Sequence, residues 1–193
     1  SPKGCIAMMA LVSMFLAWIN WGLSIVGSAV FVRFMVKKQR GIDDRLLVAT
    51  AYLGLETFWH SGLSASAPLL VATPKHFLEK DIDIIPIVET IFHPFNLRLA
   101  LAVLVFLTII GPLMHPKKGK ETEADPKLVA EAAFEAPIRP TEAMTPALKL
   151  EHSPLINMIV GLCGGIWLFW YFGKNGFSGI NLDVVNFTFL ISG

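Results

Sequence analysis

Long apolar runs separated by short polar stretches make up most of the chain. The first run, from Gly4 to Val32, contains no charged residue. As one straight helix it would extend about 43 Å against a hydrocarbon core about 30 Å thick, whereas two crossings need about 40 residues. Asn20 and Gly22 interrupt the run near its middle. The pattern predicts a re-entrant helical hairpin over residues 1–36, with arms of about 14 residues. A kinked spanning helix is the alternative.

The second apolar run, residues 46–74, has Glu56 as its only formal charge. The stretch 56–68 in its middle is small, hydroxyl-rich and glycine-bearing, which predicts a broken transmembrane helix. An unpaired backbone group in hydrocarbon costs several kcal/mol, so irregular backbone persists there only inside protein or beside a wet cavity. The sequence therefore predicts a binding site or a packed interface at this break.

Two other apolar runs, residues 95–114 and 154–173, predict plain spanning helices, and residues 184–193 predict the start of a truncated one. The composition agrees, since 54% of residues are hydrophobic, 16% are charged and the mean hydropathy is +0.60. So little polar surface cannot cover a soluble globule. We therefore predict an all-α polytopic membrane protein held in a lipid bilayer, and a net charge of +1 predicts no nucleic-acid partner.

The connections between these runs differ in their content of basic residues. Lysine and arginine cluster in the turn 37–45 and recur through the linker 115–153, so the positive-inside rule places both in the cytoplasm. The connections 75–94 and 174–183 then lie on the external side.

Two interrupted apolar segments in succession are typical of the binding sites of secondary transporters. The amino end of a half-helix exposes N–H groups that can hold a carboxylate, and its carboxyl end exposes carbonyls that can hold a cation. The candidate substrate-binding residues at the two interruptions are Asn20, Trp21, Gly22, Ser24, Ser61, Gly62, Ser64 and Ser66.

Each candidate also has a structural alternative. Asn20 could bind substrate or could satisfy loose backbone groups at a hairpin tip. The serines could donate to a carboxylate or could bond to a carbonyl one turn earlier. Glu56 and His60 would share one face of a continuous helix, which suggests either a proton relay or gate, or a salt bridge that locks the helix.

Several sequence blocks resemble the short-chain fatty acid transporter family. They are "INWGLSIVGSAVF", "AYLG", "WHSGLSASAPLLVATP", "IPIVETIF", "FNL" and "DPKLV". The resemblance implies an inverted-repeat transporter with a hairpin and a broken helix in each repeat, of which this chain would be a middle fragment. Many members have glycine where this chain has Ser61 and Ala65, so we expect a stiffer break here.

The same resemblance implies import of a small monocarboxylate, such as butyrate or acetoacetate, across the bacterial inner membrane by alternating access. The coupling ion is open, because Glu56 and His60 favour protons whereas carbonyl-lined breaks favour Na⁺. A homodimer is a further expectation.

Two rival classes of function remain. The block "GLSAS" approaches the GxSxG motif of serine hydrolases, with Ser64 as nucleophile, but it lacks the final glycine and a preceding strand, and His60 is too near in sequence. A structural membrane subunit would need no polar breaks. We therefore expect no enzyme activity and no resident cofactor. Cys5 and Cys163 lie in apolar runs without ligand spacing, so we also expect no metal site.

Overall fold

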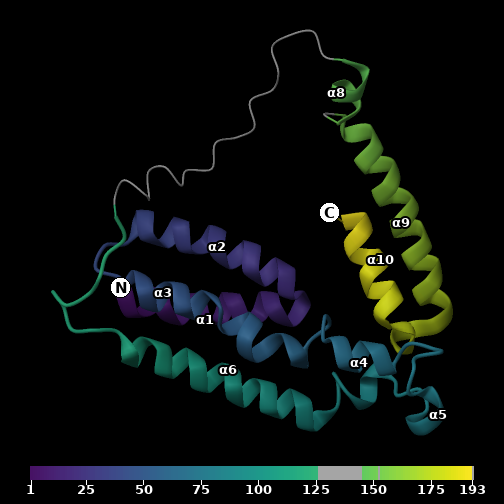
Figure 1. The fold of residues 1–193 in the computed structure, drawn as a ribbon, viewed down its shortest axis with the longest axis horizontal. Helices are drawn as coiled ribbons and strands as arrows, with labels where there is room; N and C mark the ends of the chain where they lie inside the picture. The colour runs from purple at the N-terminus through teal and green to yellow at the C-terminus, as the bar shows by residue number, and fades with distance from the viewer. Residues whose placement is uncertain (126–144, 152, 193) are drawn as a thin grey trace. The chain divides into compact units, whose positions relative to one another are not determined.

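The computed structural model describes residues 1–125, 145–151 and 153–192. Over these residues every regular element is a helix (Figure 1). The three candidate membrane spans among them, by length and composition, are Pro2–Ile19, Pro94–Met114 and Pro154–Gly179. The protein is thus an all-α membrane protein, as predicted. The chain divides into two units, Ser1–Ala133 and Phe134–Gly193, which we describe separately.

The first unit begins with two helices of equal length, α1 (Pro2–Ile19) and α2 (Trp21–Lys38), which pack against each other and are joined by Asn20 alone. Each has 18 residues and is therefore about 27 Å long, which exceeds the expected arms of about 14 residues. Both arms extend past the uncharged run, because α1 starts at Pro2, ahead of Lys3, and α2 continues through Arg33 to Lys38.

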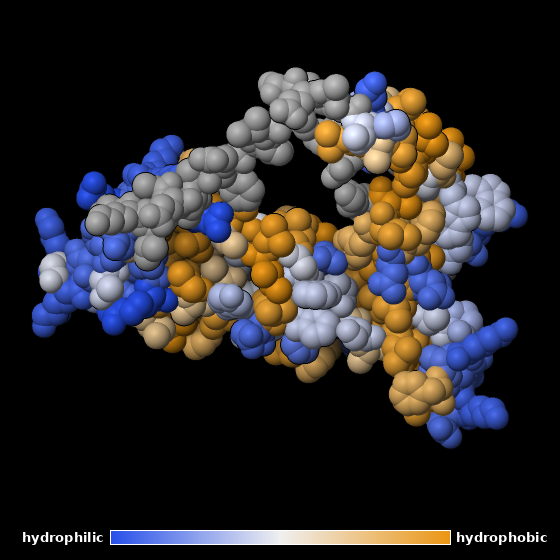
Figure 2. Space-filling view, turned by 45° about the horizontal axis from the view of Figure 1, so that its top comes forward, coloured by the Kyte–Doolittle hydropathy of each residue, from blue (hydrophilic) through white to orange (hydrophobic). Residues whose placement is uncertain are grey.

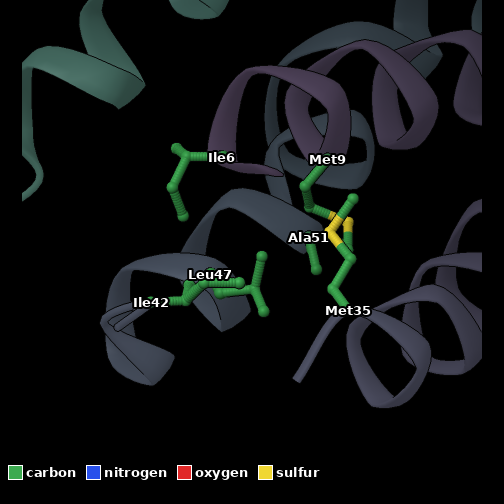
Figure 3. Close-up of a cluster of buried hydrophobic side chains, with 6 residues drawn as sticks. All are labelled: Ile6, Met9, Met35, Ile42, Leu47 and Ala51. Atoms are coloured by element: carbon green, nitrogen blue, oxygen red, sulfur yellow. The ribbon is translucent and has the colours of Figure 1, made fainter. Parts of the chain in front are cut away.

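Helix α1 lies at the centre of the first unit, between α2 and α6 (Pro94–Met114) (Figure 1). It also packs against α3 (Asp44–Ala51). One buried cluster joins α1, α2 and α3 and contains Ile6, Met9, Met35, Ile42, Leu47 and Ala51 (Figure 3). A second cluster joins α1 to α6 and contains Ala10, Met14, Phe58 and Ala100.

The segment after α3 changes helix type twice before it breaks. A π-helix, η1 (Gly54–Phe58), is followed by a 3-10 turn, η2 (Trp59–Ser61), and α-helix resumes only at α4 (Ser66–Val71). Regular α-helix thus ends at Ala51, earlier than the interruption expected at 56–68. The connection that follows holds two short elements, α5 (Glu79–Ile82) and η3 (Ile87–Glu89).

The basic turn after α2 is held to the start of the following linker by Asp43. Its carboxylate accepts from the N–H groups of Leu46 (3.0 Å) and Thr122 (2.9 Å), and its own N–H donates to His115 Nε2 (3.2 Å). The hydrogen bond from Thr122 holds the pKa of Asp43 below its ordinary value of 3.8, although burial opposes this. Hydrophilic residues gather at this end of the unit (Figure 2). Linker residues 126–144 lie outside the described residues.

The second unit consists of α8 (Pro146–Glu151), α9 (Pro154–Asn175), η4 (Gly176–Gly179) and α10 (Leu182–Ser192). Helix α9 starts where the sequence predicted a span and ends two residues later than expected. Helix α10 packs back onto α9, where the rings of Trp167 and Phe187 meet edge to face with 4.7 Å between their centroids. Cys5 and Cys163 are both free thiols.

Candidate functional site

The two interruptions of the first unit lie against each other. The N–H of Leu63 donates to the carbonyl of Trp18 (2.7 Å), and the N–H of Trp21 donates to Oγ of Ser64 (3.0 Å). We call this meeting of residues 18–21 with residues 62–64 the junction. It joins segments more than forty positions apart in the chain.

At Gly62 the main chain of the second interruption lies in close contact with that of the first. A Cβ atom at this position would lie 2.1 Å from the Trp18 carbonyl oxygen and 2.6 Å from the Trp18 Cα. Both atoms belong to the backbone and cannot move aside as a flexible side chain could. Only glycine therefore fits at residue 62, and the junction is a contact of backbone with backbone.

Asn20 ends one helix and starts the next. Its backbone is extended (φ −156°, ψ 130°), and its N–H donates to the carbonyl of Leu16 (2.8 Å) at the end of α1. Its Oδ1 accepts from the N–H of Leu23 (2.9 Å) at the start of α2. The side-chain oxygen thus has the structural role that the sequence left as an alternative. Within the described residues, the Nδ2 group of Asn20 makes no hydrogen bond.

Ser24 lies away from the junction, although the sequence grouped it with Asn20. Its hydroxyl donates to the carbonyl of Ser13 (2.8 Å), and the Ser13 hydroxyl donates to the carbonyl of Thr50 (3.1 Å). All three side chains are buried between α1, α2 and α3. A Cβ on Gly54 would lie 2.1 Å from the same Ser13 carbonyl oxygen. Neither Ser13 nor Gly54 was predicted as a site residue, since a single serine or glycine within an apolar run is common.

Ser61 and Ser66 flank the junction in different ways. The Ser61 hydroxyl donates to the carbonyl of Phe58 (2.7 Å), as the structural alternative anticipated, and the Ser61 carbonyl accepts from Nδ2 of Asn96 (3.0 Å). Asn96 was missed because it stands at the start of an ordinary helix. Ser66 is the first residue of α4 and is exposed.

Trp21 and Gly22 form the open side of the junction. The Trp21 side chain is 49% exposed, whereas Ser64 is only 8% exposed. Gly22 is partly exposed at the start of α2, beside Oδ1 of Asn20.

Glu56 and His60 are not brought together as an ion pair. They lie on η1 and η2 and both are exposed, and no ion pair joins them in the described part of the chain. The continuous helix that would align them is absent, because the segment changes from π to 3-10 geometry between them. The salt bridge that the sequence left as an alternative is therefore not formed in the described part of the chain, and the relay or gate stays a prediction. The His60 ring packs instead against Trp59, with 4.3 Å between centroids.

Ser64 lacks the surroundings of a serine nucleophile. Its oxygen accepts from a backbone N–H, and no hydrogen bond in the described ranges links it to a histidine. Residues 1–125, 145–151 and 153–192 also contain no group of three His, Cys, Asp or Glu side chains that could hold a metal ion.

Comparison with known proteins decides the family. The model of the family described as "Short chain fatty acid transporter" matches residues 1–193. The chain belongs to the short-chain fatty acid transporter family. The resemblance seen in the INWG and GLSAS blocks is confirmed.

Two curated relatives from this transporter family illustrate the similarity. A protein of Escherichia coli K12, provisionally named a short-chain fatty acid transporter, is 38% identical over 175 residues, which cover 91% of this chain and 39% of that protein. A protein of the same name from Haemophilus influenzae is 33% identical over 201 residues, which cover 100% of this chain and 44% of that protein. The chain thus spans less than half the length of these relatives. No solved structure matches it.

Proposed function

We propose that the full-length protein is a secondary active transporter that imports short-chain fatty acids or similar small monocarboxylates across the bacterial inner membrane. Family membership and the names of both relatives support this substrate class. The observation that carries the proposal is the pair of hydrogen bonds that joins the two interruptions at Trp18, Trp21 and Ser64.

The junction offers several hydrogen-bond donors to an anion. Gly22 N–H points out of the first turn of α2, where the helix dipole favours negative charge. Asn20 Nδ2 and the Ser64 hydroxyl hydrogen add two side-chain donors, while a carboxylate only accepts. The exposed ring of Trp21 supplies an apolar wall for a short acyl chain.

The backbone contact at Gly62 suggests how such a site would move. Helices α1 and α2 and the break at 62–65 would travel together against the remainder of the full-length protein, which is the form that alternating access takes in other secondary transporters. Glu56 and His60, exposed on neighbouring turns, would serve coupling or gating. Sodium ions or protons would drive the cycle, and the transporter would work as a homodimer.

Uptake of labelled butyrate and acetoacetate by cells that express the full-length protein tests the proposal. Asn20→Ala and Ser64→Ala remove one junction side chain each and should each lower uptake at least ten-fold at equal membrane expression. Asn175→Ala and Ser178→Ala, two exposed positions of the second unit, are matched controls that should keep wild-type uptake.

Wild-type uptake in both junction variants would refute the site. Stoichiometric labelling of Ser64 by a fluorophosphonate probe would favour the hydrolase instead. Repeating the assay with and without sodium, at two pH values, identifies the coupling ion.

A further inference from the structure

A cavity of about 480 Å³ opens at the basic end of the first unit. Three segments line it: the start of α1 at residues 1–3, the turn after α2 at residues 39–41, and the chain after α6 between residues 115 and 121. One candidate membrane span, α1, begins here and another, α6, ends here, so the cavity lies where both helices reach the membrane surface. The positive-inside rule predicts that this surface is the cytoplasmic one.

Hydrogen bonds hold the second and third of these segments together. The N–H of Gly41 donates to a carboxylate oxygen of Glu123 (2.6 Å), and the N–H of Asp43 donates to Nε2 of His115 (3.2 Å). Since an N–H group can only donate, Nε2 of His115 carries no proton and the ring is neutral. The cavity is thus held open by contacts of the fold itself, and its one histidine among the described residues adds no charge.

Positive charge dominates the lining of the cavity. Each segment contributes one exposed cation, namely Lys3, Arg40 and Lys118. None of these side chains has an ion-pair or hydrogen-bond partner among the residues that the structure describes, and their long stems let the charged ends turn toward a bound group. Glu121 is the acid among the described lining residues, and its own backbone N–H holds the pKa of its carboxyl below the ordinary value of 4.5. Three cations and one carboxylate leave a net charge of +2, which favours an anion.

The surroundings of the cavity indicate that this anion belongs to a lipid. Leu113 and Met114 directly precede the lining residue His115 along the chain, and they are 70% and 66% exposed. They end a candidate span, so this apolar surface lies beside acyl chains while the basic cavity lies at the level of the headgroups. Basic pockets between membrane helices on the cytoplasmic side bind the headgroups of anionic phospholipids.

We propose that this cavity binds the phosphate headgroup of an anionic phospholipid, held by Lys3, Arg40 and Lys118, with the acyl chains against Leu113 and Met114. The bound lipid bridges the start of α1, the turn after α2 and the end of α6. The site is separate from the junction, because Lys3 lies fifteen residues before Trp18, or about 22 Å along α1. It goes beyond the transport function proposed above and does not depend on it.

The test measures the melting temperature of the purified full-length protein in a neutral detergent. A short-chain phosphatidylglycerol should raise it, because a ligand that binds only the folded state stabilises that state. Phosphatidylcholine of the same chain length carries no net charge and should have little effect. Inorganic phosphate lacks the acyl chains and should act only at concentrations at least about ten-fold higher.

A matched pair of lysines locates the site. Lys118→Gln removes a charge from the lining, whereas Lys117→Gln removes the neighbouring exposed charge, which does not line the cavity. Lys118→Gln and Arg40→Gln should each raise the phosphatidylglycerol concentration for a half-maximal shift about five-fold, the expected effect of one basic residue beside an anionic headgroup. Lys117→Gln should leave it unchanged. Without lipid all three variants should melt at the wild-type temperature, because none of these side chains has a partner to lose in the described ranges.

An equal increase in Lys117→Gln and Lys118→Gln would overturn the site and assign the effect to the general positive charge of this end. No response to phosphatidylglycerol, or an equal response to phosphatidylcholine or to inorganic phosphate, would overturn an anionic lipid as the ligand. The assay contains no carboxylate substrate, so its failure would leave the transport proposal standing. Asn20→Ala and Ser64→Ala test that proposal separately.

Discussion

The two interruptions of the first unit satisfy their backbone groups in opposite ways. At Asn20 the chain leaves helical geometry for a single residue, and every hydrogen-bond partner of Asn20 itself lies within four positions along the sequence. The second interruption runs through π and 3-10 turns to the loop before Ser66, and its partners Trp18 and Trp21 lie more than forty positions away. The first is a local capping device, whereas the second exists only when α1 and α2 are already packed beside it.

Gly62→Ala should disrupt the contact of the second interruption with Trp18, and its loss of stability should be the largest of the expected effects. The added methyl group cannot coexist with the Trp18 backbone, so we expect a destabilisation of about 3 kcal/mol or more and loss of uptake. The melting temperature of the full-length protein in detergent measures this.

Gly161→Ala on α9 is the matched control, because a Cβ there meets nothing within 4 Å. It should be neutral or stabilise by up to about 1 kcal/mol, as alanine favours helix over glycine. Equal melting temperatures in the two alanine variants would show that the close contact at Gly62 is not made.

Ser64→Ala should have the next largest effect on stability. It leaves the Trp21 N–H without its acceptor in a partly buried place, which costs about 1 to 3 kcal/mol. Ser64→Thr keeps the hydroxyl and tests whether the oxygen is what matters. A thermal melt in which Ser64→Ala equals the wild type would disprove the hydrogen bond between the two interruptions.

Asn20→Ala should cost less, about 1 kcal/mol, because it removes a helix cap and nothing distant. Asn20→Asp should restore stability, since aspartate caps equally well, but should still impair uptake by placing a negative charge where an anion is proposed to bind. Stability and uptake measured on the same preparation separate the two effects. Normal uptake in the Asn20→Asp variant would argue against a carboxylate at this position.

Lowering the pH should open the contact between the basic turn and residues 115–125 while the two interruptions stay closed. This is the smallest of the expected effects. The hydrogen bonds at the junction involve no titratable group, whereas Asp43 holds Thr122 through a carboxylate whose pKa lies below its ordinary value. A carboxyl group whose pKa is lower in the folded state than in the unfolded state stabilises the fold at pH values above its unfolded-state pKa. This stabilisation is lost as the pH falls through the folded-state pKa. Below pH 3.8, hydrogen exchange corrected for its intrinsic rate should therefore accelerate in residues 115–125 before residues 18–24. In Asp43→Asn this pH dependence should disappear.

The difference between the interruptions also explains what the sequence could reveal. Asn20 was predictable because an amide with a glycine two residues later stands out in an apolar run. The hydroxyl of Ser64 was predictable as a feature of the break, but its partner Trp21 was not, because no local pattern encodes a contact across the fold. The partner of Ser24 was equally unpredictable: its hydroxyl donates to the Ser13 carbonyl on α1, eleven positions earlier, and a substrate-binding role for Ser24 stays a prediction.

The all-helical class and the span at α9 followed from hydrophobic content and run length alone. The lengths of α1 and α2 did not, because charged residues were taken as helix limits although α2 continues past Arg33. The cavity at the basic end gave no signal in the sequence, since the three segments that line it lie far apart along the chain.

At Gly62 one main chain contacts the other directly, with no side chains between them. Most packed surfaces can slide by small steps because side chains change rotamer. No side chain lies at this contact to do so. The two broken segments are therefore held rigidly to each other, and in the proposed transport cycle they would have to move as one rigid unit.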